Sequence, residues 1–89
     1  MKAIITISGL DRVGIIADVC TLLAVHEVNI LDLSQTVMEG IFTMTLLVDT
    51  STSSHTFDEI RDAVIQKGKA INMIIHIQRE DIFNAMHRV

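Results

Sequence analysis

The residues with the clearest chemical potential lie in the stretch Ile7–Ile16, ISGLDRVGII, where a charged turn separates two apolar runs. Gly9 and Gly14 relieve steric limits on the backbone of this turn. Asp11 and Arg12 place opposite charges beside the expected start of a helix, whose free N–H groups favour an anionic group. The combination suits a zwitterion such as an amino acid. The alternative is a solvated connection held together by a local pair between Asp11 and Arg12.

The other reactive residue types do not form a catalytic or metal-binding set. The four histidines are His26, His55, His76 and His87; they show no i, i+4 pair and favour structural or solvated roles. Cys20 is the only cysteine, so an intramolecular disulfide or a CxxC motif is excluded, and we expect a buried, inert thiol. No nucleophile, base and orienting group occur together. We therefore expect no enzyme activity, no catalytic residues, no metal and no cofactor.

Composition narrows the possible partners. The chain has 89 residues, a net charge of −4 and only seven Lys and Arg, which argues against binding to nucleic acid. Its 49% apolar content is high for one small domain, so we expect a partner subunit to cover part of the surface in a homodimer or higher oligomer. No run is long enough to span a membrane and no signal peptide is recognised, which predicts no membrane contact and a cytoplasmic protein.

Hydrophobic periodicity predicts six elements in the order βαββαβ. The expected ranges are a strand over 2–8, a helix over 14–27, a strand over 29–38, a strand after the turn at Glu39 and Gly40, a helix from Thr56, and a strand over 70–78. Thr56 and Glu59 form a capping-box pattern, and Gly68 is the expected C-cap of the second helix. A polar helical tail is expected after the last strand.

This order predicts a ferredoxin-like α+β sandwich. Right-handed crossovers place both helices on one face of a four-stranded antiparallel sheet with strand order 4-1-3-2, followed by the short C-terminal helical tail. The second strand then lies on an edge and carries no charge from Leu33 to Met38, which favours pairing with a second copy. The sheet face lacks the aromatic residues of an RNA-binding module, the first loop lacks the thiolates of a soft-metal chaperone, and the phosphate cradle of an acylphosphatase is absent.

The motif Gly9–Ile16, GLDRVGII, the later HEVNI of residues 26–30 and the βαββαβ order together resemble an ACT domain. The resemblance covers about residues 2–78, so we assign residues 1–78 to the domain and 79–89 to the tail. The short form is similar to stand-alone bacterial proteins related to the glycine-cleavage-system repressor. ACT domains are regulatory binders of amino acids and other small ligands, and they associate through sheet edges and helices.

The resemblance implies a ligand site for this chain. Asp11 would meet the amino group of the ligand, Gly14 would permit its close approach, and Asn29 would reach it from a neighbouring subunit. Arg12 would make either a carboxylate contact or an outward salt bridge. Gly9 departs from the serine-sensing members, which carry a polar side chain there, so the ligand is left open.

The full implied ligand-binding set is Asp11, Arg12, Val13, Gly14, Ile15, Asn29 and Ile30. Two of these residues have simpler alternative roles, because Asp11 could cap the first helix and Asn29 could cap the turn before its strand. The function that the resemblance favours is a homo-oligomeric sensor of a small molecule, expected to be an amino acid, with a further protein as a possible partner. The alternative is a protein–protein interaction module whose ligand site is vestigial.

Overall fold

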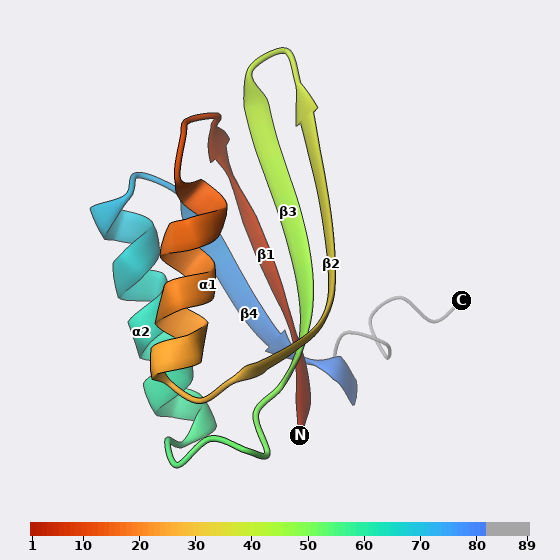
Figure 1. Ribbon diagram of the computed structural model, residues 1–89, viewed down its shortest axis with the longest axis vertical. Coiled ribbons are helices and arrows are strands. Elements are labelled where there is room, and N and C mark those ends of the chain that lie inside the picture. Colours follow the sequence, from red (N-terminus) through yellow and green to blue (C-terminus); the bar gives the residue numbers. More distant parts are fainter. Residues whose placement is uncertain (82–89) are drawn as a thin grey trace.

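A four-stranded antiparallel sheet, ordered β2-β3-β1-β4, carries two helices on one face (Figure 1). The computed structural model describes residues 1–81. Its elements are β1 Lys2–Leu10, α1 Ile15–Val25, β2 Asn29–Met38, β3 Ile41–Asp49, α2 Phe57–Ala70 and β4 Ile74–Arg79. The predicted ferredoxin-like sandwich and its strand order, read from the opposite edge, are confirmed.

The core lies between the sheet and the helices because alternate residues of the central strands are apolar. The buried rows are Ala3, Ile5 and Ile7 of β1 and Phe42, Met44, Leu46 and Val48 of β3, as the alternation predicts. They pack against Ile15, Val19 and Leu23 of α1 and Ile60 and Val64 of α2. Burying each large aliphatic side chain stabilises the fold by about 1.5–3 kcal/mol, so these rows fix the register of the sheet.

The predicted capping box opens α2. The hydroxyl of Thr56 accepts a hydrogen bond from the backbone N–H of Glu59 at 3.2 Å, and the Glu59 carboxylate accepts one from the backbone N–H of Thr56 at 2.8 Å. Hydrogen bonds with Thr56 lower the pKa of Glu59, and the bond from the Thr56 backbone has the larger effect. The start of α2 is therefore set by local sequence, as expected for this motif.

The predicted end of α2 at Gly68 is wrong. The helix continues to Ala70, Asn72 adopts a φ of 62°, and β4 occupies 74–79 instead of the predicted 70–78. Gly68 is buried where α2 crosses β4, and a Cβ there would lie 2.9 Å from both Ile75 Cγ1 and the Met73 carbonyl oxygen. The glycine is required for close helix–sheet packing, so its role could not be separated from a C-cap by sequence pattern.

Strand β2 is an uncovered edge. Figure 1 shows the β2–β3 hairpin extending past the end of the helical layer. All of β2 is exposed except Ile30, which is half-buried, and a β-bulge interrupts the pairing between Ile30 and Asp32. The backbone of this edge is available for pairing with another strand.

The predicted C-terminal tail and the predicted absence of a membrane span are compared with the structure as follows. The predicted tail, 79–89, lies outside the described residues after Asp81, and Arg79 is the last residue of β4. Among residues 1–81, neither α1 nor α2 combines the length and hydropathy required to span a bilayer.

Replacing Gly68 by alanine tests the packing role. Alanine favours a helix over glycine by about 1 kcal/mol, but the new Cβ would overlap Ile75 and Met73, and overpacking costs about 1–3 kcal/mol. We expect Gly68→Ala to lower the free energy of unfolding in urea titrations. The control Gln66→Ala, at an exposed position of the same helix, should change it by less than about 0.5 kcal/mol. A stabilised Gly68→Ala protein would contradict the packing role.

Candidate functional site

The charged turn between β1 and α1 is held against the β2–β3 turn. The backbone N–H of Asp11 donates a hydrogen bond to the carbonyl oxygen of Gly40 at 2.9 Å, directly after the last β1–β3 pair, Leu10 with Ile41. Gly40 has a φ of 80°, a conformation that glycine adopts without steric cost. The turn is therefore anchored through its backbone, which leaves the Asp11 side chain available.

An open cleft of about 640 Å³ lies between the β1–α1 turn and the hairpin. Its lining consists of Asp11, Arg12, Gly14, Ile15, Ile16 and Ala17 from the turn and helix, and Gln35, Thr36, Val37 and Phe42 from the hairpin. Ile15 and Phe42 are only 2% and 3% exposed, so the cleft reaches the edge of the core. Most of the lining is apolar, with a few polar side chains, as in typical small-molecule sites.

The first turn of α1 contributes unpaired backbone donors to this cleft. Gly14 is the N-cap, with a φ of 93° and no side-chain cap, and the helix's first hydrogen bond runs from Asp18 N to Gly14 O at 2.9 Å. The N–H groups of residues 15–17 consequently lack intrahelical acceptors. Such groups favour an anion, and the alternative role of Asp11 as a helix cap is wrong.

The Asp11 carboxylate makes no hydrogen bond or ion pair with any residue in the described range 1–81. It lines the same cleft as the free end of α1. The cleft therefore presents one carboxylate and a set of backbone N–H donors, which together match a molecule that carries an ammonium and a carboxylate group.

Arg12 pairs with Asp18 and not with Asp11. Its guanidinium donates to the Asp18 carboxylate at 2.8 Å and to the Val13 carbonyl oxygen at 2.8 Å. The hydrogen bond from Arg12 is the main reason that the pKa of Asp18 is lowered. Of the roles implied for Arg12, the salt bridge is the one present, and the predicted alternative of an Asp11–Arg12 pair is wrong.

Three residues of the predicted ligand set lie away from the cleft within one copy of the chain. Val13 is 96% exposed and is not part of the lining. Asn29 pairs with Asp49 and Ile30 with Val48, whereas the cleft uses Gln35–Val37 near the other end of β2. At about 3.3 Å per residue, Asn29 and Gln35 are roughly 20 Å apart along the strand. One copy brings together Asp11, Arg12, Gly14 and Ile15.

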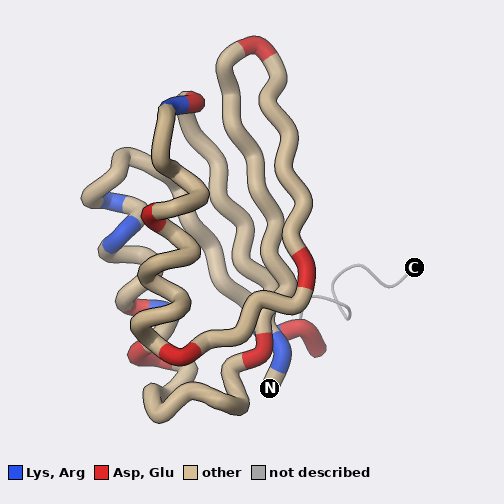
Figure 2. Tube along the Cα trace, in the orientation of Figure 1, with Lys and Arg blue, Asp and Glu red and all other residues tan. Residues whose placement is uncertain are grey.

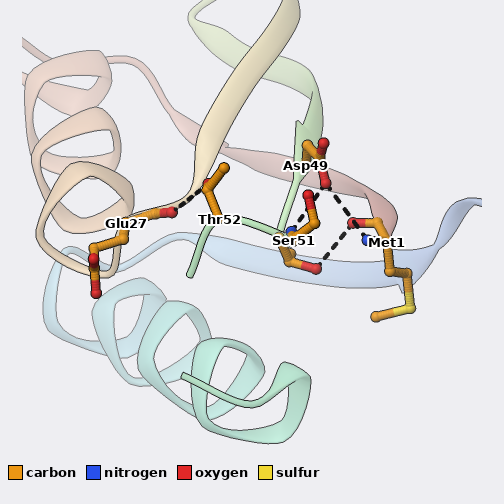
Figure 3. Close-up of polar contacts among 6 residues, drawn as sticks. Met1, Glu27, Asp49, Ser51 and Thr52 are labelled. Atoms are coloured by element: carbon orange, nitrogen blue, oxygen red, sulfur yellow. Dashed lines mark hydrogen bonds and ion pairs between the residues drawn. The ribbon is translucent and has the colours of Figure 1, made fainter. Parts of the chain in front are cut away.

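The loop after β3 holds the start of β2 in place. Thr52 donates to the carbonyl oxygen of Glu27 at 2.9 Å, and Ser54 donates to the Glu27 carboxylate at 2.6 Å, which lowers the pKa of Glu27. Figure 3 shows the Thr52 contact beside the bonds from Ser51 and the chain's N-terminus to Asp49. The turn before Asn29 is thus fixed, and Asn29 makes no side-chain hydrogen bond among the described residues that would support its alternative role as a cap.

The part of the cleft that comes from the hairpin and from the first turn of α1 was not predicted from the sequence. The missed residues are Ile16, Ala17, Gln35, Thr36, Val37 and Phe42. The available signal was the strand order, since β3 beside β1 places the hairpin turn next to the charged turn. Within residues 1–81 no group of His, Cys, Asp or Glu has the geometry of a metal site.

Comparison with known proteins agrees with this fold. The sequence pattern of the ACT domain matches residues 2–78. The chain belongs to the ACT domain family. A UPF0237 protein of Clostridium acetobutylicum is 52% identical over 89 residues, which is the whole of both chains. This ACT domain is therefore similar over its full length to a bacterial protein of the same size.

Two solved structures place the ACT fold in context. An ACT domain protein from Streptococcus pneumoniae is 41% identical, with a TM-score of 0.83 over 98% of both chains. A protein described as a glycine cleavage system transcriptional repressor is 22% identical, with a TM-score of 0.76 over 86% of this chain and 44% of that one. The second likeness shows a shared fold.

The Arg12–Asp18 pair predicts a pH-dependent contribution to folding. The lowered pKa of Asp18 means that the stabilisation is present above the ordinary aspartate pKa of about 3.9 and is lost as pH falls through the lower folded-state value. We expect Arg12→Ala to raise the pKa of Asp18 in NMR titrations of the side-chain carboxyl. Asp49 is the control, because hydrogen bonds from Ser51 lower its pKa and should persist. An unchanged Asp18 pKa would contradict the pairing.

Proposed function

We propose that this ACT domain is a regulatory sensor that binds an α-amino acid in the cleft beside Asp11 and works as a homodimer. The observation that carries the proposal is the joint placement of an unpartnered carboxylate and an uncapped helix start on one cleft with apolar walls. The ammonium group of the ligand would pair with Asp11, and its carboxylate would accept hydrogen bonds from the N–H groups of residues 15–17.

Gly14 supports this binding through its backbone. A Cβ at Gly14 would meet only Arg12 Nη1, at 3.6 Å, so space alone does not require glycine there. The φ of 93° at this position does require glycine, because residues with a side chain rarely adopt this conformation. The conformation directs the chain into α1 with the N–H groups open to the ligand, so glycine's role is to shape the turn as well as to permit close approach.

A second copy paired along β2 would bring Asn29 to the cleft. In an antiparallel pair about a two-fold axis, the start of one β2 lies beside the end of the other. The partner's Asn29 and Ile30 would then lie next to Gln35–Val37. Ile30 shares the helix-side face with Val48, and the chain enters β2 from the helical side. Figure 2 shows that charges gather at the turns and helices, leaving most of the strands uncharged.

A protein–protein interaction module is the second candidate function. The observation that favours it is the exposure of apolar side chains around the charged turn, at Leu10, Val13, Met38 and Ile41. These side chains could contact another protein even if the cleft were vestigial. A screen with amino acids separates the two functions, since only the sensor gains stability from a ligand.

Removing the Asp11 carboxylate tests the sensor. We expect one or more L-amino acids to raise the melting temperature of the wild type, and Asp11→Ala to weaken binding by roughly 5- to 150-fold, since a charged hydrogen bond contributes about 1–3 kcal/mol. Asp62→Ala removes an exposed carboxylate from α2 and should bind like the wild type. If no L-amino acid shifts the wild type at millimolar concentration, the sensor is ruled out.

Placing a charge at the middle of β2 tests the dimer. In a two-fold pair, Leu33→Lys sets like charges close together on adjoining strands, and we expect sedimentation equilibrium to show a monomer where the wild type is a dimer. Thr43→Lys adds the same charge to an exposed position of β3 and should leave the dimer intact. A monomeric wild type at micromolar concentration would refute pairing along β2.

A further inference from the structure

We infer that the ligand is an L-α-amino acid with a neutral aliphatic side chain, and that the Arg12–Asp18 pair excludes acidic amino acids. The inference rests on the proposed function and goes further by assigning the class of ligand. It follows from the charges and the apolar walls of the cleft.

The cleft has one cationic side chain, and that side chain is already paired. Among residues 1–81, Arg12 is the only Lys or Arg that lines the cleft. Asp18 and the Val13 carbonyl oxygen each accept a hydrogen bond from its guanidinium at 2.8 Å. The pair is neutral, so Asp11 leaves the cleft with a net negative charge. An acidic amino acid would bring a second carboxylate that has no cation to meet and would be repelled by Asp11.

A ligand with a basic side chain is also expected to bind weakly. Asp11 is the only carboxylate among the described residues that line the cleft, and the ligand's own ammonium group pairs with it. A second cation would lie against the apolar walls without a partner, at a large desolvation cost. Asp18 cannot pair with this second cation, because its carboxylate is already paired with Arg12 and is also attracted by Lys67. Asp18 and Lys67 line a separate groove between the helices.

The walls match an aliphatic side chain. Ile15, Ile16 and Ala17 form one side of the cleft, and Val37 and Phe42 form the other. Each methylene that a ligand buries between them strengthens binding by roughly fourfold, the equivalent of the transfer free energy of that group. Leucine should therefore bind some tens of times more tightly than alanine, which carries the same charged groups.

The test compares charge classes of ligand on the full chain. Isothermal titration of the wild type with L-leucine, L-alanine, L-glutamate and L-lysine should give the tightest binding for leucine, at least tenfold tighter than for glutamate or lysine. In Asp18→Asn the side chain at position 18 keeps its shape but loses its negative charge. The charge of Arg12 is then no longer neutralised and can attract an acidic side chain of the ligand. We expect the ratio of leucine to glutamate affinity to fall at least tenfold.

Controls keep this inference distinct from the proposed function. Asp62→Asn removes the same charge from an exposed position of α2 and should leave the affinity ratio unchanged. If no amino acid binds the wild type, the sensor itself fails. If glutamate or lysine binds more tightly than leucine, the sensor stands and this inference is overturned.

The variants test the role of the Arg12–Asp18 pair. An unchanged ratio in correctly folded Asp18→Asn would overturn the role given to the pair. Circular dichroism establishes that the variant is folded. Should Asp18→Asn not fold, Arg12→Gln tests the inference from the other partner of the pair. It removes the cation altogether, so glutamate should remain excluded. Binding of glutamate by Arg12→Gln as tight as that of leucine would also overturn the inference.

Discussion

The hydrogen bond from Asp11 N to Gly40 O is the constraint on which the candidate site depends. It joins the turn after β1 to the turn after β2, two segments almost thirty residues apart in sequence. The β1–β3 pairing brings the charged turn beside the hairpin, and this bond holds the turn in place there, so that the apolar walls of the cleft face each other. The bond uses only backbone atoms, so it leaves the side chains of both turns free to determine what is bound.

The sequence predicted the fold well because its elements are defined locally. The alternation of apolar residues in β1 and β3 indicates strands, and the capping box at Thr56 indicates the start of a helix. The crossover rule then leaves little choice of topology. Gly68 was misassigned because a glycine near the end of a helix can be a cap or a packing residue. The choice depends on β4, a strand that follows it in the sequence.

The candidate site was less predictable because its parts come from different elements. Asp11, Arg12, Gly14 and Ile15 lie close together in the sequence and were all assigned to the ligand set. Gln35 and Phe42 were missed, since only strand order and register bring them to the turn. The partner of Arg12 was also missed. Asp18 lies six residues further on, in the first turn of α1, and the choice between it and Asp11 depends on the direction of the Arg12 side chain.

The two edges of the sheet differ in length, and this difference bears on how copies of the chain can assemble. β2 presents ten residues in all and carries no charge after Asp32, whereas the opposite edge, β4, presents six residues and ends at Arg79. An isologous contact through β2 uses the long edge of both copies at once. Only the short edges then remain exposed, and they are poor templates for adding further strands. Under the proposed pairing along β2, the architecture would therefore favour a closed pair over an open-ended fibre.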